Sequence, residues 1–114
     1  MSNLHEECGI FGIFSENRQN VAETVYYGLF ALQHRGQESC GIVVNDDGIF
    51  RDYKDNGLAH EVFTRHVLEN LGPGNMAIGH DRYSTTGANE RINAQPIVVN
   101  HHKGRMALAH NGNI

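Results

Sequence analysis

The stretch "CGIFGIF", residues 8–14, limits the folds open to this chain more than any other segment. Apolar residues and glycines fill consecutive positions, so a strand built from it is apolar on both faces. A second run of this kind, "SCGIVV", follows at residues 39–44. Strands that are apolar on both faces must be covered on both faces, so we expect sheet packed on sheet with helices outside.

Two segments have the spacing of amphipathic helices. Residues 21–34 repeat apolar side chains every three or four positions, and Asn20 with Glu23 resembles a capped start. Residues 58–71 show the same spacing and end at "GPG", residues 72–74. Each pattern predicts a helix on the outside of the sheets.

Turn signals between short apolar runs predict hairpins. "NDDG" separates residues 39–44 from 48–54, and "HHKG" separates 97–99 from 106–110. Residues 76–83 read as a further strand, and the polar stretches 15–20 and 84–96 read as loops. Hairpins with segregated helices favour an α+β class with largely antiparallel sheets.

Composition narrows the classes of function. The 114 residues carry a net charge of −4 without a Lys/Arg cluster, which argues against a partner that is nucleic acid or an anionic membrane. No apolar run approaches the roughly 20 residues of a membrane span, and "MSNLHEE" does not resemble a secretory signal. Two cysteines in such a chain read as free thiols, so we expect a cytoplasmic protein.

Cys8 has two interpretations. A free cysteine in an apolar strand is often a small packed side chain. If the chain were cut between Glu7 and Cys8, the new α-amino group, with an ordinary pKa of about 7.7–8.0, would stand beside the thiol as a general base. That hypothesis makes residues 1–7 a propeptide. At the other end, "MALAHNGNI" is an apolar run that enters a turn without a linker, so we expect residues 8–114 to be the first part of a domain that continues in a longer protein.

Two further motifs carry polar groups suited to a substrate. In "GHDRYSTTG", residues 79–87, Arg82 is able to grip a carboxylate through two parallel hydrogen bonds, with Thr85 beside it; the alternative is a surface ion pair with Asp81 or Glu90. In "AHNGN", Asn111 and Gly112 suit an oxyanion hole, and the alternative is a plain turn.

The remaining polar motifs have simpler explanations. His34 and Arg35 end the first predicted helix, where cations complement the helix dipole. Cys40 lies in an apolar strand and is interpreted as packing. His60-Glu61 starts like a zinc-protease helix, but Thr64 stands where the second histidine belongs, so we expect no metal site in this chain.

Taken together, "CGIFGI", "LQHRGQES", "GHDRYSTTG", "NAQP" and "LAHNGN" resemble, in order and spacing, the class II (N-terminal nucleophile) glutamine amidotransferase domain. The resemblance implies a four-layer αββα sandwich in which Cys8 is the nucleophile, released when residues 1–7 are removed autocatalytically. It makes Arg82 and Thr85 the ligands of the glutamine carboxylate. Asn111 and Gly112 become the oxyanion pair. Arg35 and Gly36 match a structural element beneath the nucleophile, and Tyr83 is a further supporting residue.

"HRGQES" and "AQP" favour the member of this family that passes ammonia to phosphoribosyl pyrophosphate in purine synthesis. The resemblance then implies a further domain that binds phosphoribosyl pyrophosphate with Mg²⁺, a 4Fe-4S cluster in some members, and a homo-oligomer. Family members also use a later aspartate for the glutamine ammonium group. The alternatives are a family member with another acceptor, a glutamine-sensing module without catalysis, and a Cys8 that never becomes an N-terminus.

Overall fold

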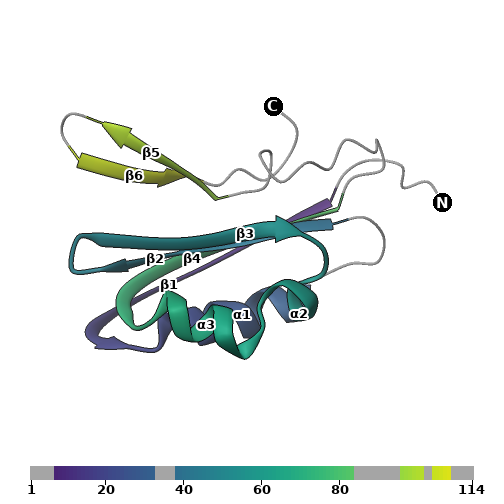
Figure 1. Cartoon of the computed structure of the whole chain (residues 1–114), viewed down its shortest axis with the longest axis horizontal. Coiled ribbons are helices and arrows are strands. Elements are labelled where there is room, and N and C mark those ends of the chain that lie inside the picture. Colours follow the sequence, from purple (N-terminus) through teal and green to yellow (C-terminus); the bar gives the residue numbers. More distant parts are fainter. Residues whose placement is uncertain (1–6, 33–37, 84–95, 102–103, 109–114) are drawn as a thin grey trace.

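The computed structural model describes residues 7–32, 38–83, 96–101 and 104–108. They form a four-stranded sheet with helices on one face and a separate hairpin beyond the other face (Figure 1). The strand order is β1-β4-β2-β3, and every neighbouring pair is antiparallel. In chain order the elements are β1 (Glu7–Gln19), α1 (Val21–Leu32), β2 (Glu38–Asp46), β3 (Ile49–Asn56), α2 (Ala59–Val62), α3 (Arg65–Leu71), β4 (Gly74–Tyr83), β5 (Ile97–His101) and β6 (Gly104–Leu108).

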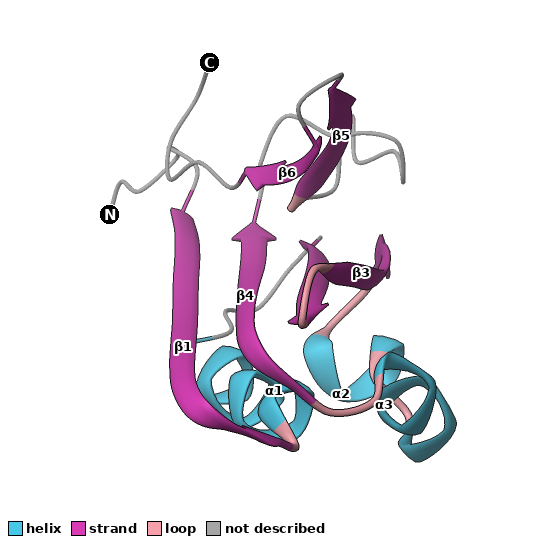
Figure 2. Cartoon of the chain, turned by 90° about the vertical axis from the view of Figure 1, so that its left-hand side faces the viewer, coloured by secondary structure: helices cyan, strands magenta, loops and turns pink. Residues whose placement is uncertain are grey.

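The layer order agrees with the α+β class expected from the sequence. Figures 1 and 2 show the helices below the main sheet and the β5–β6 hairpin above it. The predicted hairpin turn between β2 and β3 is confirmed, with positive φ at Asp47 (54°) and Gly48 (93°). The described residues thus supply a helical layer, a sheet and the hairpin that faces it, as expected of part of an αββα domain.

Strand β1 is longer than the sequence pattern predicted. Residues 15–19 belong to the strand, so the prediction of a loop over 15–20 is wrong for all but Asn20. The register shifts between Phe14 and Gln19. Because β1 is an edge strand, its polar end meets solvent instead of a core, and polar residues there do not interrupt the strand.

Helix α1 lies close against the sheet because a glycine on each side of the contact leaves room for a side chain of the other. A Cβ added to Gly79 of β4 would lie 2.5 Å from a Val25 methyl group, and one added to Gly28 of α1 would lie 2.5 Å from the Phe11 ring. Val25 and Leu29 are fully buried there. The predicted cap is also present, since the Glu23 amide donates to Asn20 Oδ1 at 3.4 Å.

The second predicted helix is two helices, so the expectation of one helix over residues 58–71 is wrong. Phe63 ends α2 and turns into the core, where its ring lies 6.3 Å from those of Tyr26 and Tyr53. Thr64 then starts α3, and its hydroxyl accepts a hydrogen bond from the Val67 amide at 3.3 Å. The break lets an aromatic side chain fill the gap between α1 and β3.

Two arginines bind Asp46 and link the β2–β3 hairpin to β1 and to the end of α3. Arg18 donates to both oxygens of Asp46 at 2.9 and 3.0 Å, and Arg51 donates to Oδ2 at 3.0 Å. Arg51 also donates to the carbonyls of Leu71 and Pro73 at 2.6 and 2.7 Å, which closes the end of α3. The pKa of Asp46 is lowered to about 2, mostly by hydrogen bonds from Arg18 and to a smaller extent by the hydrogen bond from Arg51.

This network predicts a local stability that depends on pH. The pKa of Asp46 is lower in the folded chain than its ordinary 3.8, so its contribution is complete above about pH 4 and is lost as the pH falls toward 2. We expect amide protection factors at the β2–β3 turn of the full-length protein to fall over that range. Asp46→Asn should be less protected at pH 6 and should lose this pH dependence, whereas Asp47→Asn, beside it in the turn, should keep it.

Candidate functional site

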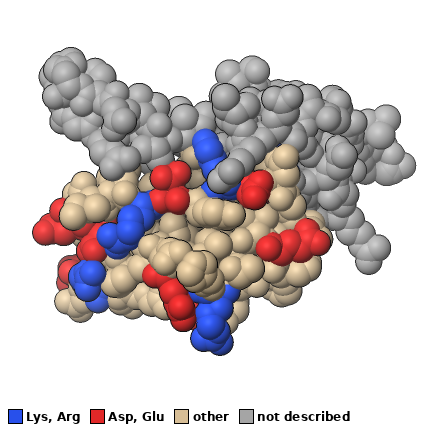
Figure 3. Space-filling model, viewed as in Figure 1, with Lys and Arg blue, Asp and Glu red and all other residues tan. Residues whose placement is uncertain are grey.

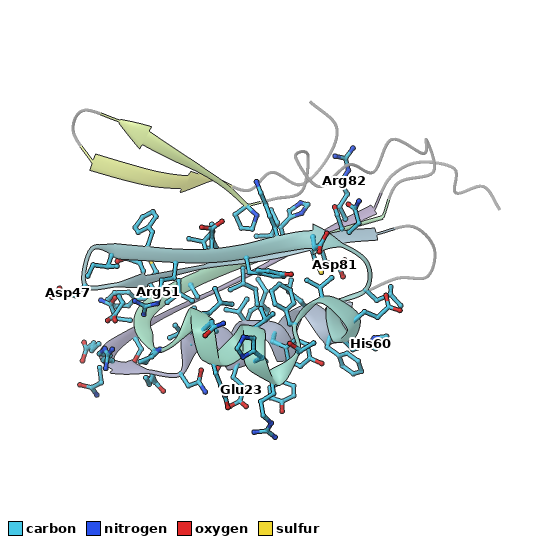
Figure 4. All side chains as sticks on the ribbon, viewed as in Figure 1. Glu23, Asp47, Arg51, His60, Asp81 and Arg82 are labelled. Carbon is cyan, nitrogen blue, oxygen red and sulfur yellow. The ribbon has the colours of Figure 1, made fainter. Side chains whose placement is uncertain are left out.

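Strand β4 divides its residues between the two faces of the sheet. Gly79 contacts α1, so the alternation along a strand puts Ala77 and Asp81 on the helix side and Ile78, His80 and Arg82 on the opposite side. Figure 4 shows Arg82 pointing away from the helices and Asp81 lying on their side of the strand. The site suggested by the sequence therefore belongs to the face that β5 and β6 overlie.

Three strands bring candidate residues into one row across this face. Arg82 in β4 is the register partner of Cys8 in β1 and of Ser39 in β2. Residues directly opposite in an antiparallel pair share a face, with Cβ atoms about 4.5–5.5 Å apart. The β1–β4 pairing thus makes neighbours of the predicted nucleophile and the predicted carboxylate ligand, although 74 positions separate them in the sequence.

The same geometry bears on the alternative interpretation of Arg82, a surface ion pair with Asp81 or Glu90. Asp81 is buried, with 2% of its surface exposed, and lies on the helix side of the sheet. Adjacent strand residues point in opposite directions. The guanidinium is directed toward the face that Cys8 shares, and Glu90, the other proposed ion-pair partner, lies outside the described residues.

The structure places some of the other predicted residues and leaves the rest undescribed. Tyr83 ends β4 and is the register partner of Glu7, so the Glu7–Cys8 bond lies at the start of the ladder. Outside the described residues lie Arg35, Gly36, Thr85, Asn111 and Gly112. Their roles stay predictions.

Burial along this face differs between the strands. On the edge strand β1, Ile10 and Phe14 are 41% and 65% exposed, whereas His80 of β4 and Ser39 of β2 are 0% and 3% exposed. Where the face is buried, electrostatic contacts are stronger, because the local dielectric constant is lower than in water. The sequence motifs did not predict that His80 and Ser39 lie beside Arg82. Alternation along the strand, counted back from Arg82, would have placed His80 on this face.

Cys40 has the structural role predicted for it. Its register partner is Asp81, which puts it on the helix side of β2, away from Cys8. The side chain is fully buried, and its thiol donates to the Gly57 carbonyl at 3.5 Å. The two cysteines of the chain therefore occupy register positions on opposite faces of one sheet.

Other surface features of the described residues lie elsewhere. An open hollow of about 580 Å³ between α1 and α3, lined in part by Tyr26 and Tyr27, is on the helix side. Lys/Arg and Asp/Glu residues are interspersed on the face shown in Figure 3. Within the described ranges no three His, Cys, Asp or Glu residues cluster as metal ligands. None of the helices described is both long and apolar enough to cross a bilayer.

Comparison with known proteins confirms the recognition made from the motifs. Over 107 residues the chain is 53% identical to the amidophosphoribosyltransferase of Methanocaldococcus jannaschii; the match covers 94% of this chain and 22% of that protein. The chain therefore spans about a fifth of the length of the curated relatives it matches. It matches no family model.

Two solved structures share the fold. One, described as the allosteric regulatory enzyme of purine biosynthesis, matches with a TM-score of 0.77 and 39% identity over 86% of this chain and 21% of the other. The second is the glutamine phosphoribosylpyrophosphate amidotransferase of B. subtilis in complex with ADP and GMP. It matches with a TM-score of 0.69 and 38% identity over 91% of this chain and 21% of the other. The described elements therefore have the fold of an amidotransferase segment.

Proposed function

We propose that this chain, similar over nearly its whole length to amidophosphoribosyltransferases, is the glutamine-hydrolysing part of such an enzyme. The observation that carries the proposal is the β1–β4 register, which sets Cys8 directly opposite Arg82 on one face. A nucleophile and a carboxylate ligand on directly opposite strand positions suit a small amino acid. The ligand holds the carboxylate at one end of the molecule while the nucleophile attacks the group at the other end. Glutamine has a carboxylate at one end and an amide at the other.

The chemistry follows from the groups of the chain. The α-amino group of Cys8, free once Glu7–Cys8 is cut, takes the thiol proton, and sulfur attacks the side-chain amide carbon of glutamine. Asn111 and Gly112 donate hydrogen bonds to the oxyanion, and the protonated amine returns its proton to the departing ammonia. Water then hydrolyses the thioester to glutamate. Arg82, with Thr85, holds the substrate carboxylate throughout.

The rest of the protein would use the ammonia. We infer a second domain where ammonia displaces pyrophosphate from phosphoribosyl pyrophosphate, giving 5-phosphoribosylamine in purine synthesis; Mg²⁺ would support the leaving pyrophosphate there. Two cysteines cannot supply the four thiolates of a 4Fe-4S cluster, so any cluster would be held outside this chain. We expect a cytoplasmic homo-oligomer without nucleic acid or membrane partners.

The N-terminus of the full-length protein tests the proposal. We expect protein purified from its own cells to begin at Cys8 and to hydrolyse glutamine, because the proposed mechanism uses the free α-amine next to the thiol as its base. Intact mass, N-terminal sequencing and a glutamate assay measure this. A matched pair of genes sharpens the test: one lacks codons 2–7, so that removal of Met exposes Cys8, and the other adds one uncleaved alanine before Cys8.

The first of these proteins should be active and the second inactive at equal folding. Protein that still begins at Met1 or Ser2 and yet hydrolyses glutamine would show that the α-amine is not the base. A chain that begins at Cys8 but binds glutamine without hydrolysing it would instead support a sensing module. Glutamine hydrolysis with a different acceptor for the ammonia would point to another member of the family.

A further inference from the structure

We propose that the outer edge of β1, along residues 8–14, pairs with a further strand of the same protein that lies outside these 114 residues. Among the described strands the main sheet has two edges, β1 at one end and β3 at the other (Figure 2). An edge strand carries a row of backbone N–H and C=O groups that can pair with another strand. The two edges differ in sequence, and this difference indicates which of them is covered in the full-length protein.

Strand β3 has the features of an edge that stays open to solvent. Half of its eight residues are charged, namely Arg51, Asp52, Lys54 and Asp55. Charged side chains along an edge discourage pairing with another strand, because pairing would remove some of them from water. The sequence of β3 therefore protects this edge without help from another segment.

The first part of β1 has none of this protection. Residues 8–14, CGIFGIF, include no charged residue and no proline. Phe11 and Ile13 pack against the buried core, whereas Ile10 and Phe14, on the other face, are 41% and 65% exposed. An apolar edge of this length would promote aggregation if it stayed open. Polar residues follow from 15 to 19, where the register with β4 shifts, and they end the part of β1 that needs a neighbour.

Gly12 is an independent sign of a neighbour on this side. Its φ is not positive, so the backbone conformation does not call for glycine. A Cβ added to Gly12 would lie 3.5 Å from a methyl group of Ile78 and 3.6 Å from the carbonyl oxygen of Ala77, which are ordinary contact distances. Crowding against β4 therefore does not require glycine either. Glycine inside a strand is typical where another backbone or a large cross-strand side chain approaches closely.

The rest of the protein is long enough to supply this strand. About four-fifths of the length of the curated relatives lies outside this chain. Seven residues of strand extend about 23 Å, so one strand of ordinary length covers residues 8–14. We expect an uncharged strand that runs antiparallel to β1, as in every described pair of this sheet, with large side chains beside Gly9 and Gly12.

The added strand would complete the row in which Cys8 lies. A residue directly opposite Cys8 on that strand has its Cβ about 4.5–5.5 Å away and shares the face of Arg82 and Ser39. The rest of the protein therefore contributes one side chain next to the nucleophile, on the side away from Arg82. This consequence rests on the proposed function, whereas the strand pairing itself does not.

Hydrogen exchange in the full-length protein tests the pairing. Amides along an antiparallel strand point alternately to the two sides of the strand. We expect both sets of amides in residues 9–14 to exchange slowly, within about tenfold of each other, because β1 has a partner on each side. In β3, the matched edge, the set that points away from β2 should exchange at least about 100-fold faster than the other set. Such an alternation in β1, or slow exchange of both sets in β3, would overturn the proposal.

Paired proline substitutions test the same edge without locating the amides in advance. Gly12→Pro and Ile13→Pro remove two consecutive amides, one on each side of β1. We expect each to lower the Tm of the full-length protein by at least about 10 °C relative to the alanine variant at the same position, because a central strand does not tolerate proline. Of Asp52→Pro and Tyr53→Pro in β3, one should stay within about 3 °C of its alanine variant. One tolerated proline of the pair in β1 would overturn the proposal.

A crystal structure of the full-length protein identifies the strand. A strand of the same chain beside residues 8–14 supports the proposal. A strand from a second copy, a helix or loop in that place, or solvent along this edge would overturn it. None of these tests measures glutamine hydrolysis, so the failure of this inference and the failure of the proposed function are distinguishable.

Discussion

Replacement of Cys8 by alanine is expected to abolish glutamine-dependent synthesis in the full-length protein and to leave ammonia-dependent synthesis in place. Without the thiol no thioester forms, and loss of a nucleophile typically costs at least on the order of 10⁴-fold in rate. Ammonia supplied from solution bypasses the glutaminase, so the acceptor reaction should continue. Assays of the same preparation with glutamine and with ammonium salts measure the two activities.

Cys40→Ala is the matched control for this prediction. Cys40 is the second cysteine of the chain, is fully buried, and lies on the helix side of β2, where it donates to the Gly57 carbonyl. Its replacement should lower stability slightly and leave both activities near wild type. Full glutaminase activity in Cys8→Ala would refute the assignment. Loss of both activities in a well-folded Cys8→Ala protein would contradict the separation of the two half-reactions.

Local sequence patterns predicted most of the elements, because their signals act over a few residues. Asn20 with Glu23 did start a helix, and the Asp-Gly pair did turn a hairpin. The failures came from tertiary context. Residues 15–19 remain a strand because β1 is an edge, and the helix over 58–71 breaks where Phe63 turns into the core. Neither the edge position nor the place of Phe63 is encoded in a local period.

The candidate site was predictable as a set of residues but not as a geometry. The motifs named Cys8 and Arg82 separately; the β1–β4 register that makes them neighbours joins segments far apart in the chain. No local pattern specifies which strand will pair with which. The full burial of His80 was not predictable for a related reason, since it depends on what covers the sheet, whereas its place on the face of Arg82 follows from alternation alone.

Substitution of Arg82 is expected to have the second largest effect, this time on substrate binding. Arg82→Ala should raise the KM for glutamine by on the order of 100-fold or more, as is typical when one partner of an enclosed charge pair is removed. Arg82→Lys should recover only part of this, because an ammonium group cannot form two parallel hydrogen bonds with a carboxylate. Ammonia-dependent synthesis should not change. Initial rates over a range of glutamine concentrations provide the measurement.

The α-amide of glutamine, which lacks the carboxylate charge, makes this test specific to the contact. Wild-type protein should strongly prefer glutamine to this analogue, and Arg82→Ala should treat the two nearly alike, since the group that distinguishes them is gone. Arg18→Ala removes an exposed arginine paired with Asp46 and should keep the preference. If Arg82→Ala still prefers glutamine as strongly as wild type, then another group binds the carboxylate, and the row of Cys8, Arg82 and Ser39 is a structural feature of the sheet alone.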